Sequence, residues 1–210
     1  TAPRQDRLQE LAIQMRAQHD IDVDVIADDL GEPAAPARIG ATATRDGRAV
    51  DMLVNNAGYG VPGHYDKVDW ATHAQFMQVL VTAPLHLCHL VLPAMRERGY
   101  GRIINVASLA GLVPATPGNT LYGPAKAFLM RVSQALAMEN RAHGIHVCAL
   151  CPGFTYSEFH DVSQARGLVS KLPGWMWSSA RDVVRQGLDA VERGDVVCVP
   201  GRVNRAIKVL

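Results

Sequence analysis

Residues 101–127 read GRIINVASLAGLVPATPGNTLYGPAKA. The stretch opens with an apolar run that favours a buried strand over 102–107. Ser108 follows this strand directly, and a loop rich in glycine and proline leads on to a helical pattern. That pattern begins with Tyr122 and Lys126, which are four residues apart and therefore share one face of a helix. A strand, a loop and a helix in this order predict one unit of an α/β sheet.

The pair of Tyr122 and Lys126 is typical of a proton donor, because an ammonium beside a phenol favours the ionised phenolate. Ser108 comes at the carboxyl end of a strand, which is the edge where open α/β sheets bind ligands. We therefore expect carbonyl reduction or alcohol oxidation. Each residue also has a structural interpretation when taken alone: Tyr122 as an amphipathic core residue and Lys126 as an exposed cation on a helix.

The order of elements along the chain predicts one doubly wound domain over residues 1–210. Strands are expected at 21–27, 50–54, 102–107, 144–150 and 196–199, and helices near the start of the chain and at 32–45, 70–98, 122–142 and 179–192. Ser178 or Ser179 is expected to cap the last of these helices. Because helices of this length separate successive strands, the sheet is expected to be parallel, with helices on both faces in a three-layer α/β/α arrangement.

Composition excludes several classes of partner. The 210 residues are 48% hydrophobic and 20% charged, as in ordinary globular proteins, and the formal net charge is +1. With no basic face along the sequence, we expect no nucleic-acid partner and no membrane partner. We also expect no apolar run that approaches the length of a membrane span.

The cysteines indicate a reduced, cytoplasmic protein, because all four lie in apolar patterns where free thiols behave as small hydrophobic groups. They are Cys88, Cys148, Cys151 and Cys198. Two of them form a CxxC, but it overlaps the end of a strand and has no second pair. We therefore expect no metal site.

Four motifs follow one another along the chain at consistent positions. They are Asn55-Asn56-Ala57-Gly58 after one strand, Ser108 at the end of the next, Tyr122-x-x-x-Lys126 on the following helix, and Pro152-Gly153 after the strand beyond it. In this order the chain resembles the classical short-chain dehydrogenase/reductase family over nearly its whole length. A single Tyr-x-x-x-Lys occurs by chance in many proteins, whereas the ordered set is specific. The resemblance implies a Rossmann-type fold.

The resemblance also implies roles for the three polar residues of the opening stretch. Tyr122 would be the general acid that protonates the substrate oxygen while a nicotinamide cofactor delivers hydride. Lys126 would lower the pKa of Tyr122 and hydrogen-bond the nicotinamide ribose. Ser108 would orient the carbonyl and stabilise its developing negative charge. The implied activity is an NAD(P)(H)-dependent oxidoreductase acting on a secondary alcohol/ketone pair.

Further positions are implied to contact the cofactor. Asn55, Ala57 and Gly58 match the family's adenosine edge, Asp29 and Leu30 its adenine contact, and Pro152, Gly153, Thr155 and Ser157 its nicotinamide carboxamide segment. The first set is equally consistent with a tight turn, and Asp29 with an exposed helix cap. Arg4 stands near the position that selects the cofactor, and a basic residue there favours NADP(H) over NAD(H). As a solvated first-turn residue, Arg4 would select neither.

The chain departs from the family at its start. The first strand and its glycine-rich phosphate loop are absent from the sequence, and we expect about 30 to 40 residues to be missing, the size of one βα unit plus a strand. Residues 58–63 read GYGVPG and follow a strand, but Pro62 interrupts them and no helix begins there. We therefore reject them as the phosphate loop.

A second departure is Leu80, where most members of the family carry an asparagine that holds a water linking the lysine to solvent. Leucine cannot hold such a water, so the proton takes another route, activity is reduced, or the position was altered. Leu80 could also simply pack in the core. The alternative function is a catalytically weak or silent dinucleotide-binding sensor or assembly protein.

Residues 154–178 are expected to cover the substrate. Their apolar side chains are Phe154, Phe159, Leu168, Val169, Leu172, Trp175, Met176 and Trp177. This content favours a hydrophobic or aromatic carbonyl compound, although Trp175 and Trp177 could instead anchor the loop to the body. The apolar helix expected at 70–98 resembles the family's oligomer-forming helices, which implies a homodimer or homotetramer.

Overall fold

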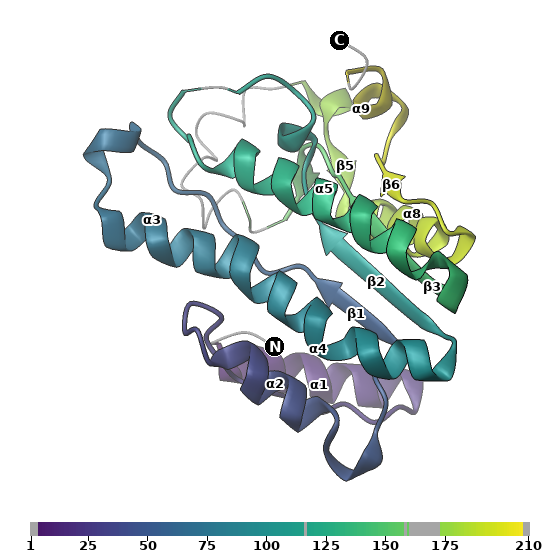
Figure 1. Cartoon of the computed structure of the whole chain (residues 1–210). Helices are drawn as coiled ribbons and strands as arrows, with labels where there is room; N and C mark the ends of the chain where they lie inside the picture. Colours follow the sequence, from purple (N-terminus) through teal and green to yellow (C-terminus); the bar gives the residue numbers. More distant parts are fainter. Residues whose placement is uncertain (1–3, 116, 158, 160–172, 208–210) are drawn as a thin grey trace.

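The computed structural model describes residues 4–115, 117–157, 159 and 173–207. Within this part of the chain the main sheet has four strands: β1 (Met52–Asn55), β2 (Gly101–Val106), β3 (Ile145–Leu150) and β6 (Val197–Cys198). All are parallel and lie in the order β1-β2-β3-β6 (Figure 1). The parallel sheet predicted from the sequence is confirmed, with strand ends shifted by one or two residues.

Helices cover both faces of the sheet in three layers. They are α1 (Gln5–His19), α2 (Ala35–Ala43), α3 (Trp70–Met77), α4 (Ala83–Arg98), α5 (Tyr122–Asn140), α8 (Ala180–Arg193) and α9 (Arg202–Ile207). Helices α4 and α5 lie on one face, where they pack on Ile103 and Val147. Helix α8 packs on Ile104 and Cys148 of the opposite face (Figure 1). Because both faces of β2 and β3 are covered, successive residues of these strands are mostly apolar instead of alternating with polar ones.

A second, two-stranded parallel sheet joins β4 (Thr155–Tyr156) to β5 (Ser178–Ser179). Ser179 is also the N-cap of α8, and its hydroxyl accepts a hydrogen bond from the Asp182 amide at 3.0 Å. Of the two serines expected to cap this helix, the structure therefore selects Ser179. The small sheet ties both ends of the segment expected to cover the substrate to the start of α8.

The strand predicted at 21–27 is wrong, since these residues form no ladder. Instead, Arg16 of α1 donates to the Val23 carbonyl, and Arg48 forms an ion pair with Asp24. An alternating apolar pattern indicates that a segment suits a strand, but pairing requires a neighbouring strand. Within the described residues β1 pairs on one side only, with β2.

Residues 70–98 form one continuous helical segment, as predicted. It consists of α3, the π-helical turn η3 (Gln78–Thr82) and α4. Pro84 lies directly after η3, at the start of α4, and Pro93 lies inside α4.

By length and composition this 29-residue segment could cross a membrane, since its most apolar window has a mean hydropathy of 1.5. The expectation that no apolar run approaches that length is therefore wrong. The evidence for a span is weak, because half of the window is buried here and core helices of soluble proteins pass the same test.

Two glycines at the ends of helices allow a matched test of backbone packing. Gly144 has φ +72°, and a Cβ there would lie 2.2 Å from the Gly99 carbonyl oxygen. Gly194 has φ +78°, but its Cβ would meet only ordinary contacts with His146 at 3.6 Å. In the full-length protein we expect Gly194→Ala to cost the left-handed penalty of about 1–2 kcal/mol. Gly144→Ala should cost clearly more, as measured by denaturant unfolding, and equal losses would contradict the close approach.

Candidate active site

Ser108, Tyr122 and Lys126 are brought together where β2 ends and α5 begins. Ser108 follows β2 and caps the short helical turn Leu109–Gly111, with its Oγ accepting from the Ala110 amide at 3.1 Å. Tyr122 is the first residue of α5. Pro124 therefore lies in the first turn of the helix, the location at which its missing N–H is tolerated.

Two glycines let the turn after Ser108 approach α5 closely. A Cβ on Gly111 would lie 2.7 Å from the Ala127 amide nitrogen. A Cβ on Gly123 would lie 3.1 Å from the Ala110 carbonyl oxygen. Because both contacts are with backbone atoms, a larger side chain at either position would push the helix away from the turn and so separate Tyr122 from Ser108.

The environment of Tyr122 acts on its phenol in two opposite directions. Burial raises the pKa of Tyr122, and a hydrogen bond between its phenol and the Ser108 hydroxyl lowers that pKa. The Lys126 Nζ lies 5.7 Å from the centroid of the Tyr122 ring. The Ser108 hydroxyl and the Lys126 ammonium thus both lie near Tyr122.

Lys126 is a buried ammonium, only 4% exposed, whose Nζ donates to the Val106 carbonyl at 2.7 Å. Burial lowers the pKa of Lys126 to about 8, and interaction with the Cys151 thiol opposes that shift. An ammonium has three donors. Val106 takes one of them, so the residues present fit a ligand that offers hydroxyl acceptors, such as a ribose. Gly58 borders this ammonium, since a Cβ on it would lie 3.5 Å from Nζ.

Leu80 lies beside the same ammonium, in the π-helical turn between α3 and α4. It is 1% exposed and packs in a cluster with Phe76 and Ala125. Its Cγ lies 3.6 Å from the position of a Cβ on Gly58. The structure thus supports the core-packing interpretation of Leu80, which offers Lys126 no polar atom.

The predicted adenosine edge is only partly available to a cofactor. The side chain of Asn55 is buried and donates to Asn105 Oδ1 at 2.8 Å and to the Pro84 carbonyl at 3.3 Å. These bonds occupy the Nδ2 of Asn55. Ala57 is exposed and Gly58 is half-buried, at the end of β1 where a ligand could contact both.

Asp29, Leu30 and Arg4 occupy different environments. The Asp29 carboxylate accepts from the Gly31 amide at 2.9 Å in a local turn, so Asp29 does not cap α2, whose N-cap residue is Ala34. Leu30 is buried in the core. Arg4 is exposed at the start of α1. The proposed cofactor contacts of all three stay predictions.

The Pro152-Gly153 segment is fixed against the Ser108 turn and the C-terminal part of the chain. The Leu109 amide donates to the Pro152 carbonyl at 2.8 Å. A Cβ on Gly153 would lie 2.4 Å from Oδ1 of Asn204, a buried residue of α9 that sequence reasoning missed. The hydroxyl of Thr155 donates to the Gly153 carbonyl at 3.1 Å, and that of Ser157 to the Thr155 carbonyl at 3.5 Å.

Aromatic side chains border the tyrosine. The ring of Phe159 lies 5.8 Å from that of Tyr122, centroid to centroid. Trp177 packs on Phe154 at 5.6 Å and on Tyr156 at 4.9 Å, so it joins the two ends of the segment, whereas Trp175 is 66% exposed. Three apolar residues expected in this cover, Leu168, Val169 and Leu172, lie outside the described residues.

The chain is similar to known proteins in both sequence and structure. A family model described as short chain dehydrogenase matches residues 1–166. The chain is 36% identical over 124 residues to an uncharacterized oxidoreductase, YxjF, of Bacillus subtilis, covering 57% of this chain and 48% of that protein. It is 33% identical over 139 residues to the 3-oxoacyl-[acyl-carrier-protein] reductase FabG of Haemophilus influenzae, covering 65% and 57%. It thus spans about half the length of these curated relatives.

Solved structures agree over a larger share of the chain. A short-chain dehydrogenase from Sphingobium yanoikuyae in complex with NADPH matches with a TM-score of 0.85 and 28% identity, covering 95% of this chain and 76% of that one. A bulky-bulky ketone specific alcohol dehydrogenase from Comamonas testosteroni matches with a TM-score of 0.81 and 27% identity, covering 99% and 79%. With its parallel sheet, its flanking helices and its family match, the chain belongs to the short-chain dehydrogenase family.

Proposed function

We propose that this chain belongs to an NAD(P)(H)-dependent oxidoreductase that interconverts a secondary alcohol and a ketone. The observation that carries the proposal is the close approach of the Ser108 turn to the start of α5, which brings Ser108, Tyr122 and the buried ammonium of Lys126 together. Tyr122 protonates the carbonyl oxygen of the substrate, and Ser108 orients that oxygen. Lys126 holds the ribose hydroxyls, and its positive charge favours loss of the phenol proton.

The nicotinamide cofactor, when bound, supplies the hydride. Lys126 and the backbone from Asn55 to Gly58 form one side of its site, and the Pro152-Gly153 segment, with Thr155 and Ser157, forms the other. Asp29 and Leu30 contact the adenine. We favour NADP(H) because Arg4 supplies positive charge near the 2′-phosphate position, and the NADPH complex of a relative supports this choice.

The substrate class is a hydrophobic or aromatic carbonyl compound. The proposal rests on Phe159 beside Tyr122 and on the aromatic cluster around Trp177. Residues 1–210 act as one domain, with 154–178 covering the substrate. A cytoplasmic homodimer or homotetramer is consistent with four free cysteines and with exposed apolar side chains on α4 and α5, such as Leu90 and Phe128.

The alternative is a weak or silent dinucleotide-binding protein, and Leu80 is the observation that favours it. Turnover of full-length protein with NADPH and a panel of ketones separates the two functions. Tight cofactor binding without oxidation of NADPH by any ketone would contradict the enzyme.

Tyr122→Phe removes the proton donor and keeps the ring. We expect kcat for ketone reduction to fall by about 10²- to 10⁴-fold, the usual contribution of a general acid, with cofactor affinity retained. Steady-state kinetics and cofactor titration of the full-length variant measure both. Near-normal reduction would remove Tyr122 as the acid.

Activity should fall as the pH rises through about 8, because Lys126 is an ammonium below its lowered pKa and neutral above it. The pH profile of kcat/KM for reduction reports this ionisation in the free enzyme. In Lys126→Arg the cation does not titrate in this range, so the residual activity should lose the fall near pH 8. An unchanged profile in that variant would assign the ionisation to another group.

Leu80→Asn tests whether a polar group is tolerated beside Lys126. Because Leu80 packs among apolar side chains, we expect the amide to lower the free energy of unfolding by about 1–3 kcal/mol. Leu80→Met, which stays apolar, is the matched control and should lose less. Unchanged stability in Leu80→Asn would mean that water reaches this position. A water-mediated proton path through η3 would then again be a candidate.

A further inference from the structure

A chain of buried polar side chains crosses the core from β1 to α5. Asn55 Nδ2 donates to Asn105 Oδ1 at 2.8 Å, and Asn105 Nδ2 donates to Ser133 Oγ at 2.9 Å. The Ser133 hydroxyl in turn donates to the Leu129 carbonyl at 2.7 Å. Every donor along this chain points the same way, from the sheet towards the helix.

Because these side chains are buried, each depends on its hydrogen bonds within the protein. Asn105 and Ser133 are both 0% exposed, so an unpaired amide or hydroxyl there would cost about 1–3 kcal/mol. The side-chain oxygen of Asn105 accepts from Asn55 of β1, and its side-chain nitrogen donates to Ser133 of α5. These two bonds fix β1 and α5 relative to β2. Apolar packing alone is non-directional and does not set the position of a helix along a strand so specifically.

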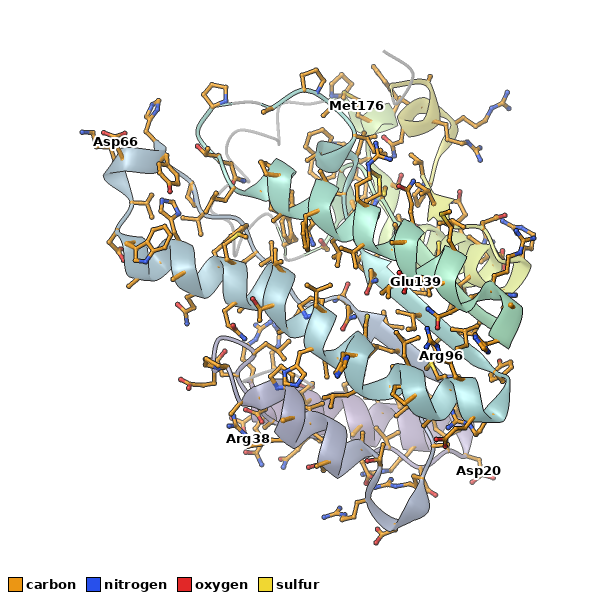
Figure 2. The ribbon with its side chains drawn as sticks, viewed as in Figure 1. Asp20, Arg38, Asp66, Arg96, Glu139 and Met176 are labelled. Atoms are coloured by element: carbon orange, nitrogen blue, oxygen red, sulfur yellow. The ribbon has the colours of Figure 1, made fainter. Side chains whose placement is uncertain are left out.

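Ser133 belongs to a stripe of polar residues on the buried side of α5. Lys126, Ser133 and Asn140 are spaced seven residues apart, which is close to two helical turns, and all three are buried. Each has a different partner: Lys126 the Val106 carbonyl at 2.7 Å, Ser133 the amide of Asn105, and Asn140 the guanidinium of Arg96 at 2.6 Å. Figure 2 shows Arg96 between α4 and the far end of α5.

Two of these attachments are to neighbouring residues of one strand. Asn105 and Val106 are consecutive in β2, and Ser108 follows two residues later. Helix α5 is thus fixed to β2 at two points about 10 Å apart along its axis, since each residue advances a helix by about 1.5 Å. The same strand therefore determines where Ser108 lies and where the first turn of α5 lies.

We propose that Ser133, held by Asn105, is a positioning residue that fixes α5 along β2 and so sets the contact between Tyr122 and Ser108. This inference rests on the proposed function for its effect on turnover. It adds to that function a residue three turns away from the tyrosine, with no contact to substrate or cofactor.

The test compares Ser133→Ala with Asn140→Ala in the full-length protein. Both variants break a buried attachment of α5, but only Ser133→Ala breaks one to β2, the strand that leads to Ser108. We expect Ser133→Ala to lower kcat/KM for reduction by about 10- to 100-fold, since small misplacements have effects of this size. Asn140→Ala should stay within about twofold. Thermal unfolding of both variants measures the stability that each loses.

A second readout needs no turnover. The phenol of Tyr122 is titrated by its ultraviolet absorbance, with the Tyr122→Phe protein subtracted to remove the other tyrosines. The groups that face this phenol are Lys126 on its own helix, the Ser108 hydroxyl and the Phe159 ring, with the Cys151 thiol near Lys126. Since the Ser108 hydrogen bond lowers the pKa of Tyr122, its loss in Ser133→Ala should move the titration to higher pH.

The outcomes are distinct. A Tyr122 titration in Ser133→Ala that matches the wild type, or equal losses of kcat/KM in both variants, would overturn the positioning role. Should wild-type protein reduce no ketone, the proposed function fails, and the titration still decides the role of Ser133. Should Ser133→Ala not fold, Ser133→Cys keeps the volume and weakens the hydrogen bond. We expect it to shift the titration in the same direction by less, and no shift would contradict the proposal.

Discussion

The hydrogen bond from the buried ammonium of Lys126 to the Val106 carbonyl is the interaction on which the site depends. It places a positive charge in the core at the end of β2, where a carbonyl and a nearby thiol are the polar groups described around it. Taking an ammonium out of water is costly, so its pKa falls to about 8. An ammonium that loses its proton near pH 8 suits a site that transfers protons near neutral pH.

The surrounding fold can be understood as the means of holding that ammonium beside a phenol and a hydroxyl. Because Gly111 and Gly123 have no side chain, the Ser108 turn packs closely on α5. Gly58 likewise lets the end of β1 approach Nζ of Lys126. Ser133 and Asn105 fix the helix farther along the same strand. Leu80 closes the side towards η3 with apolar atoms. The parallel sheet matters because it brings the carboxyl ends of β1, β2 and β3 to one edge.

Sequence reasoning found what local spacing encodes and missed what depends on distant partners. Tyr122 and Lys126 were predictable because four residues span one helical turn, and the Ser179 cap because its signal is local. The strand predicted at 21–27 failed because an alternating pattern does not reveal whether a neighbour is there to pair with it. Asn55 stays a predicted cofactor contact, and no local pattern shows that its side chain also bonds Asn105, 50 residues away. Ser133 and Asn204 are single polar residues in apolar surroundings, and no local pattern distinguishes them.

The central claim is that Lys126 is a buried cation whose pKa lies far below that of an exposed lysine. It is tested most directly by a titration of the full-length protein labelled with ¹³C at lysine Cε and followed by NMR, with Lys126→Arg used to assign the resonance. The account predicts a midpoint near pH 8 for Lys126, well separated from the exposed lysines. A midpoint near the ordinary value of about 10.4 would contradict it, because the ammonium would then be solvated and not held in the core.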